Sequence, residues 1–124
     1  MLSIGSVVLG VDDMERAVGF WTRALGHVPR DGAVDASFTV LAPAAGRAGV
    51  QLALMRSETA ADRYPRVHLD LYAADAAEQA AEVERLLGLG AERVDWDRYP
   101  EDPDFVVLAD PEGNRFCVID TSRD

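Results

Sequence analysis

The amino-acid sequence predicts an α+β fold built from two tandem βαβββ modules. The apolar runs Phe105–Ala109 and Arg115–Ile119 flank a short polar segment and have the pattern of a complete β-hairpin. Between them, Pro111 sets φ for a type I turn and Gly113 supplies a positive φ. The run Phe38–Ala42 repeats the first of these strands 67 residues earlier. Helix-capping acidic residues recur as well, so the chain is interpreted as a duplicated unit.

The first module is expected over residues 1–56. Residues 4–11 are a β-rich apolar run, and Asp12 with Glu15 has the spacing of a capping box, which predicts a helix over residues 13–25. The apolar residues of this segment recur at steps of three and four, and a glycine follows its last turn. Three strands are then expected, at residues 27–30, 36–42 and 49–55.

The second module is expected over residues 66–121. The segment 57–65 is polar, lacks periodicity and ends in a proline, so it is interpreted as a connector. After it, Asp75 with Glu78 repeats the capping signal. The expected elements in this module are a strand at 67–72, a helix that ends at 88–90, a strand at 94–96 and the hairpin. We expect residues 1–124 to form a single domain, which is long enough to bury a core.

Composition excludes several classes of function. The net charge of −10 argues against nucleic acid and anionic membranes as partners and leaves neutral or cationic small molecules. All twelve basic residues are arginine, which excludes lysine Schiff-base chemistry and a P-loop. The chain has one cysteine and no segment typical of a signal peptide or a membrane span. We therefore expect a soluble cytoplasmic protein.

Five segments of the sequence carry recognisable motifs: Val67–Leu71, the Leu-Gly-Ala that ends at Ala91, Leu108–Val118, Val11–Ala17 and Phe20–Trp21 with Leu25–Gly26. Together these motifs resemble the glyoxalase, bleomycin-resistance and extradiol-dioxygenase superfamily, also called vicinal oxygen chelate proteins. Within the superfamily, the chain is most similar to the glyoxalase-like domain subgroup. The resemblance implies two modules whose curved sheets enclose a cavity, often in a homodimer. The modules could pair within one chain or across two.

The resemblance also implies a divalent metal held by the first and last strands of each module. At the four matching positions, Ser6 stands where a histidine is usual, His68 matches, and Cys117 stands where a glutamate is expected. The fourth position falls on Val50, and a slip of one or two residues offers only Gln51 or Leu52. His68 and Cys117 are the only surviving candidates, which is too few for a catalytic metal. We therefore expect no cofactor and no tightly bound divalent metal.

Strand alternation selects the candidate ligand-binding residues. His68, Asp70 and Tyr72 share one face of their predicted strand. The complete candidate set is Ser6, Val8, His68, Asp70, Tyr72, Trp96 and Cys117. Five candidates also have a structural alternative: His68 as a hydrogen-bonded histidine, Asp70 as a solvated or salt-bridged carboxylate, Cys117 as a small buried apolar residue, and Tyr72 and Trp96 as ordinary core residues.

Two classes of function follow from these residues. The first is a metal-free small-molecule-binding protein with a degenerate metal site, whose acidic cavity and aromatic walls suit a cationic or amphipathic ligand. The second is a lyase- or isomerase-type enzyme of glyoxalase-like character, with His68 and Asp70 as catalytic acid and base, with or without a divalent metal. The chain has neither a serine-hydrolase elbow nor a dinucleotide fingerprint.

Overall fold

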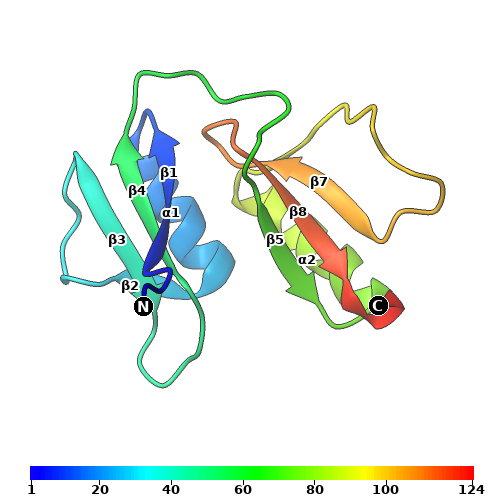
Figure 1. The fold of residues 1–124 in the computed structure, drawn as a ribbon, viewed down its shortest axis with the longest axis horizontal. Helices are drawn as coiled ribbons and strands as arrows, with labels where there is room; N and C mark the ends of the chain where they lie inside the picture. Colours follow the sequence, from blue (N-terminus) through cyan, green and yellow to red (C-terminus); the bar gives the residue numbers. More distant parts are fainter. The chain divides into compact units, whose positions relative to one another are not determined.

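The fold class is α+β, as predicted. The computed structural model describes residues 1–124 as two compact units, residues 1–60 and residues 61–124 (Figure 1). The first unit contains β1 (Ser6–Val11), α1 (Met14–Leu25), β2 (His27–Pro29), β3 (Phe38–Pro43) and β4 (Gln51–Arg56). The second contains β5 (Leu69–Ala73), α2 (Ala76–Leu89), β6 (Glu92–Arg93), β7 (Phe105–Ala109), β8 (Arg115–Asp120) and the short 3-10 helix Thr121–Arg123. Both units thus have the order βαβββ.

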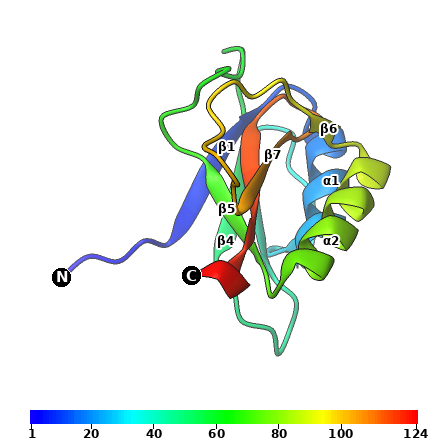
Figure 2. The same cartoon turned by 90° about the vertical axis from the view of Figure 1, so that its right-hand side faces the viewer.

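The two sheets have the same topology. The strand order is β1-β4-β3-β2 in the first unit and β5-β8-β7-β6 in the second. In each sheet the first and last strands of the module pair in parallel, and the remaining pairs are antiparallel. Helix α1 packs against its own sheet and α2 packs against β5 and β8, as Figure 2 shows for the second unit. One face of each sheet is therefore covered by the unit's own helix.

Both helices begin at an aspartate. The Asp75 carboxylate accepts the Glu78 N–H at 2.8 Å, and Glu78 in return accepts the Ala74 N–H at 2.8 Å. This confirms the predicted capping signal of α2. In α1 the cap is Asp13, which accepts the Arg16 N–H at 3.1 Å, so the prediction of Asp12 was wrong by one residue.

The correction at α1 has a visible physical reason. The Asp12 carboxylate lies 3.0 Å from the Arg56 guanidinium group, at the end of β4. The Asp12 carboxylate is thus engaged in an exposed ion pair. The next aspartate is then the one placed to accept the first free N–H group of the helix.

One predicted strand was misplaced. Residues 94–96 are not a strand, because the Val94 carbonyl accepts the Trp96 N–H at 3.0 Å and so forms a tight turn. The strand lies two residues earlier, where Glu92 and Arg93 pair with Ala109 and Leu108. Strand β5 starts at Leu69 and not at residue 67, which places His68 just before the strand. The other predicted element boundaries differ from the structure by at most two residues.

The predicted hairpin turn between β7 and β8 is present. The Asp110 carboxylate accepts the N–H groups of Glu112 and Asn114 at 2.9 and 2.8 Å. Gly113 has φ +87°, and Gly46, at the same place in the first unit, has φ +81°. Because L-residues rarely adopt this conformation, both hairpins depend on a glycine here.

A pair of glycine-to-alanine substitutions should have opposite effects on stability. Gly113→Ala is expected to lower the free energy of unfolding by about 1 kcal/mol, because alanine is strained at this φ. Its Cβ would also lie 3.3 Å from the Ala61 Cβ. Gly19→Ala in the middle of α1 has open space around the new Cβ and should raise stability by up to about 1 kcal/mol. Urea unfolding of both variants measures the signs, and equal effects would contradict the assignment of the turn.

The cores lie between each helix and its sheet. Trp21, Leu41 and Leu54 are fully buried in the first unit, as are Leu108 and Phe116 in the second. Trp21 therefore belongs to the core. No helix in the structure combines the length and the apolar character needed to span a bilayer.

Candidate functional site

The candidate site lies on the face of the second sheet that α2 leaves uncovered. Asp70 on β5 pairs in register with Cys117 on β8, and Tyr72 pairs with Ile119. Phe105 on β7 pairs with Ile119 from the other side. Since residues that are paired in register project to the same face of a sheet, these side chains line one surface.

A hollow of about 500 Å³ lies over this surface. Its lining residues come from β5, β7, β8, the loop between β6 and β7, and the C-terminal end of the chain. They are His68, Asp70, Tyr72, Trp96, Arg98, Asp104, Phe105, Cys117, Ile119 and Asp124.

The structure thus brings five of the seven predicted ligand-binding residues to one hollow. These five are His68, Asp70, Tyr72, Trp96 and Cys117. The other two, Ser6 and Val8, lie on β1 of the first unit, which pairs with β4. Their assignment to a ligand site stays a prediction, as does that of the five.

His68, Asp70 and Cys117 form a compact polar cluster in this hollow. His68 Nε2 lies 3.0 Å from Asp70 Oδ1, which is hydrogen-bonding distance. The candidate ligand atoms of all three residues lie within 4.8 Å of one another. The His68 and Asp70 side chains are 44% and 47% exposed, whereas Cys117 is buried. Solvent and dissolved molecules can therefore reach the imidazole and the carboxylate, with the sulfur beneath them.

The Cys117 thiol is held in its neutral form. Burial, and then the negative charge of Asp70, raise the pKa of Cys117 from 9.0 to about 11. Cys117 is therefore protonated at neutral pH, and it is not activated as a nucleophile. This property agrees with the small buried apolar residue considered as the alternative for Cys117.

The loop of residues 94–104 forms one wall of the hollow. Tyr64, from the segment before β5, holds this loop: its hydroxyl donates to the Asp97 carboxylate at 2.7 Å, which lowers the pKa of Asp97. The Trp96 ring lies 5.4 Å from the Tyr64 ring, and the Arg98 guanidinium group lies 3.8 Å above it. Two residues that line the hollow are thus positioned by a residue outside it.

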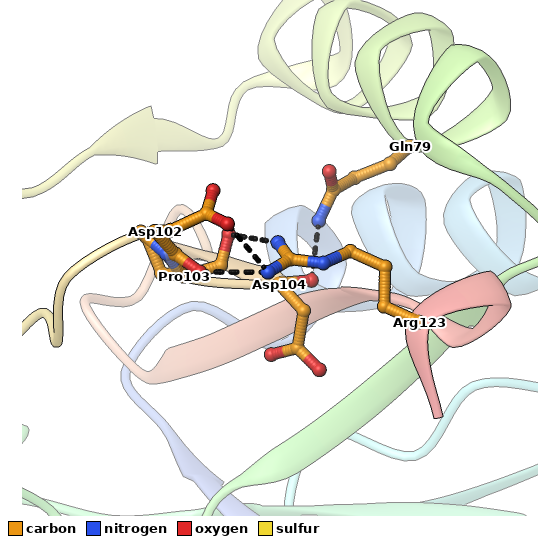
Figure 3. Close-up of polar contacts among 5 residues, drawn as sticks. All are labelled: Gln79, Asp102, Pro103, Asp104 and Arg123. Carbon is orange, nitrogen blue, oxygen red and sulfur yellow. Dashed lines mark hydrogen bonds and ion pairs between the residues drawn. The ribbon is translucent and has the colours of Figure 1, made fainter.

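The other end of this wall is fixed by hydrogen bonds to the backbone. The Gln79 amide donates to the carbonyl oxygen of Asp104 at 2.9 Å (Figure 3) and to that of Val118, also at 2.9 Å. Arg123 donates to the Pro103 carbonyl at 3.0 Å and to the Asp102 carboxylate at 2.9 Å. The Asp104 side chain extends away from the Arg123 guanidinium group in Figure 3. Its carboxylate thus remains available to line the hollow.

Sequence reasoning missed Arg98, Asp104, Phe105 and Asp124 as lining residues. Phe105 had a usable signal, because it pairs with Ile119 and therefore shares its face. Arg98 and Asp104 lie in an irregular loop without periodicity. No pattern in the sequence could have placed them in the hollow.

The register of the first unit corrects one metal-ligand position. Val8 pairs with Ala53 in the way that Asp70 pairs with Cys117, so Ala53 and not Val50 is the counterpart of Cys117. Val50 lies in the loop before β4. The chain from Leu41 to Leu52 is three residues longer than the equivalent chain in the second unit, so the offset of 67 fails beyond the turn.

A metal centre with ligands from both modules does not fit these residues. In the first unit, the counterparts of the cluster are Ser6, Val8 and Ala53, and none offers an imidazole, a carboxylate or a thiol. In the second unit, however, three donors meet, whereas the sequence count gave two because Asp70 was not considered as a ligand. The expectation of a metal-free site therefore rested on a count that was too low by one.

Comparison with known proteins identifies the family. The model of the glyoxalase-like domain family matches residues 6–119. No match was found among curated proteins. Among solved structures, a glyoxalase-related enzyme from Fulvimarina pelagi is 19% identical, with 96% of this chain and 88% of that chain covered and a TM-score of 0.70.

Two further structures have the same fold. A glyoxalase/bleomycin resistance protein/dioxygenase family enzyme from Burkholderia phytofirmans is 15% identical, with 94% of this chain and 97% of that chain covered and a TM-score of 0.73. A mutant of the fosfomycin resistance protein FosX from Listeria monocytogenes, complexed with Mn(II) and a dihydroxypropylphosphonic acid, is 14% identical, with coverages of 96% and 92% and a TM-score of 0.69. The chain therefore belongs to the glyoxalase-like domain family.

Proposed function

We propose that this protein binds a small organic molecule in the hollow of its second unit. The residues at the family's metal-ligand positions are only partly retained, so the metal centre is degenerate. The observation that carries the proposal is the His68–Asp70 pair, 3.0 Å apart, within a hollow of about 500 Å³. A volume of this size suits a drug-sized ligand. The exposed ring of Tyr72, together with Trp96 and Phe105, offers apolar surface around these polar groups.

The charges of the lining favour a cationic or amphipathic ligand. Asp70 and Asp104 contribute carboxylates, and Arg98 is the one arginine in the lining. The Arg98 guanidinium group lies over the Tyr64 ring. This cation–π contact partly satisfies the positive charge of Arg98, which then attracts an anionic ligand less strongly. Aromatic rings beside carboxylates attract organic cations. By the same reasoning, we expect a phosphonate such as the one bound to the Listeria relative to bind poorly.

The His68–Asp70 contact also favours an enzymatic alternative. A histidine oriented by a carboxylate can act as a general acid or base, and His68 is nearly half exposed to the hollow. A lyase- or isomerase-type reaction would use this pair to move a proton on the bound molecule. The neutral Cys117 thiol has no nucleophilic role in this scheme.

The binding proposal can be tested by a thermal-shift screen of cationic, neutral and anionic compounds. The screen uses protein treated with a chelator, so that metals do not contribute. Asp70→Asn should weaken a cationic ligand about tenfold to a hundredfold, because a hydrogen bond to a charged group contributes about 1.5–3 kcal/mol. A neutral ligand should lose less. His68→Ala should weaken both kinds of ligand.

The internal repeat supplies matched controls. Ser6→Ala and Val8→Asn alter the first-unit counterparts of His68 and Asp70 and should leave binding unchanged if the second unit alone forms the site. Compounds that stabilise the wild type and keep their full effect in His68→Ala and Asp70→Asn would place the ligand elsewhere. The homodimer and the cytoplasmic location stay predictions.

A further inference from the structure

The His68, Asp70 and Cys117 cluster has the composition and spacing of a metal site. It offers one nitrogen, one oxygen and one sulfur donor, all within 4.8 Å of one another, and the nitrogen and oxygen are 3.0 Å apart. A tetrahedral zinc ion, with bonds of about 2.0–2.3 Å, holds its donor atoms about 3.3–3.6 Å apart. The separations within the cluster, 3.0 Å for the nitrogen and oxygen and at most 4.8 Å overall, span this spacing.

We propose that His68, Asp70 and Cys117 bind a zinc ion within the second unit alone. Zinc sites with three protein ligands keep a fourth position open, and here that position would face the hollow. This arrangement differs from the two-module metal centre implied by the family resemblance. Asp70 lies two residues beyond the histidine position, and Ser6, Val8 and Ala53 of the first unit contribute nothing.

The sulfur donor determines which metal the site prefers. A thiolate with an imidazole favours zinc, whereas manganese and magnesium prefer sites made of oxygen ligands. The Mn(II) complex of the Listeria relative provides the contrast. For this chain we expect strong selectivity for zinc over manganese, because Cys117 stands where the family pattern has a carboxylate.

The charges and protons of the cluster balance around a divalent ion. On binding, the Cys117 S–H bond breaks, the sulfur bonds to the metal, and the proton leaves to solvent. The His68 Nε2 proton that faces Asp70 Oδ1 also leaves to solvent, and the bound imidazole is neutral with its proton on Nδ1, so that Nε2 is free for the metal. The thiolate and the Asp70 carboxylate then supply two negative charges to Zn²⁺. The ion can enter through the hollow, where the His68 and Asp70 side chains are nearly half exposed.

Zinc titration of the purified full chain, stripped with a chelator and then dialysed, tests the proposal. We expect one zinc ion per chain, measured by competition with a chromophoric chelator, and manganese binding at least about a hundredfold weaker. Cys117→Ser, Asp70→Asn and His68→Ala should each weaken zinc at least about tenfold, since even residues behind a metal ligand have effects of this size.

Two control variants distinguish the proposed site from non-specific zinc binding by acidic residues and from a metal site with ligands from both modules. Glu101→Gln removes an exposed carboxylate of the same unit, and Ser6→Ala alters the first-unit counterpart of His68. Neither should change zinc affinity. Full zinc affinity in Cys117→Ser or Asp70→Asn, equal affinity for manganese, or less than one zinc per chain would overturn the proposal.

Cobalt(II) provides a spectroscopic test that needs no variant. Cobalt in the wild-type site should show a thiolate-to-metal charge-transfer band, which should vanish in Cys117→Ser. A cobalt complex without this band would exclude Cys117 as a ligand and overturn the proposal. The inference does not rest on the proposed organic ligand. If no compound binds in the screen, the metal measurements still test the zinc site. If no zinc binds, the screen on chelator-treated protein still tests the organic ligand.

Discussion

Trp21→Ala is expected to lower the free energy of unfolding of the first unit by about 3–5 kcal/mol. The Trp21 side chain is completely buried between α1 and its sheet. Its ring lies edge to face against Phe20, with centroids 5.0 Å apart. Alanine would leave a cavity and remove this aromatic contact. Because a whole domain is stable by only about 5–15 kcal/mol, the loss is large. Urea unfolding followed by circular dichroism measures it.

The second tryptophan is a matched control for this prediction. Trp96 lies in the wall of the hollow, is only partly buried and packs on Tyr64. Trp96→Ala should therefore cost much less stability than Trp21→Ala, while weakening ligands that stack on the wall. An equal loss of stability in the two variants would show that the division between core and wall is wrong.

The Cys117 thiol is expected to react with alkylating reagents about a hundredfold more slowly in the folded, metal-free protein than in the unfolded chain at neutral pH. Burial and the Asp70 charge raise the pKa of Cys117 from 9.0 to about 11. This rise in pKa lowers the fraction of reactive thiolate at neutral pH about a hundredfold, and limited access to the buried sulfur slows the reaction further. Alkylation followed by mass spectrometry, with and without urea, measures the ratio.

The direction of the pH dependence is a second check on Cys117. Its alkylation rate in the folded protein should keep rising above about pH 10, where the unfolded chain, with a thiol pKa of 9.0, approaches its plateau. The contribution of the neutral thiol to stability is present below pH 9 and is lost as the pH rises toward about 11. Asp70→Asn should speed the reaction by removing the like charge. A rate that levels off near pH 9 in the folded protein would contradict the raised pKa.

Local signals in the sequence predicted most of the fold. The β7–β8 turn was predictable because Gly113 requires a positive φ and because the strands on both sides are apolar and β-branched. Helix α1 was predictable from its periodicity, but its cap was not. Asp12 and Asp13 are chemically equivalent, and in the structure Asp12 pairs with Arg56, which is distant in sequence, whereas Asp13 caps the helix. The position of β6 likewise depends on pairing with β7.

The same distinction explains what could be predicted of the candidate site. His68 and Asp70 were placed on one face by the two-residue period of a strand, and Cys117 was found through the hairpin. The wall of the hollow was not predictable, since Trp96 and Arg98 are held by contacts with Tyr64 across an irregular loop. The counterpart of Cys117 in the first unit was misassigned because a turn three residues longer separates the two copies.

The two sheets have matching strand registers, but only the second sheet carries the polar cluster. The first sheet has the pairing of the second, yet Ser6, Val8 and Ala53 occupy the places of the histidine, the aspartate and the cysteine. The first unit thus has the backbone pattern of the second without its reactive side chains. New chemistry in that copy would require three side-chain replacements and no change of strand pairing. The first unit is therefore a scaffold of matching strand pairing on which a second polar site can be designed.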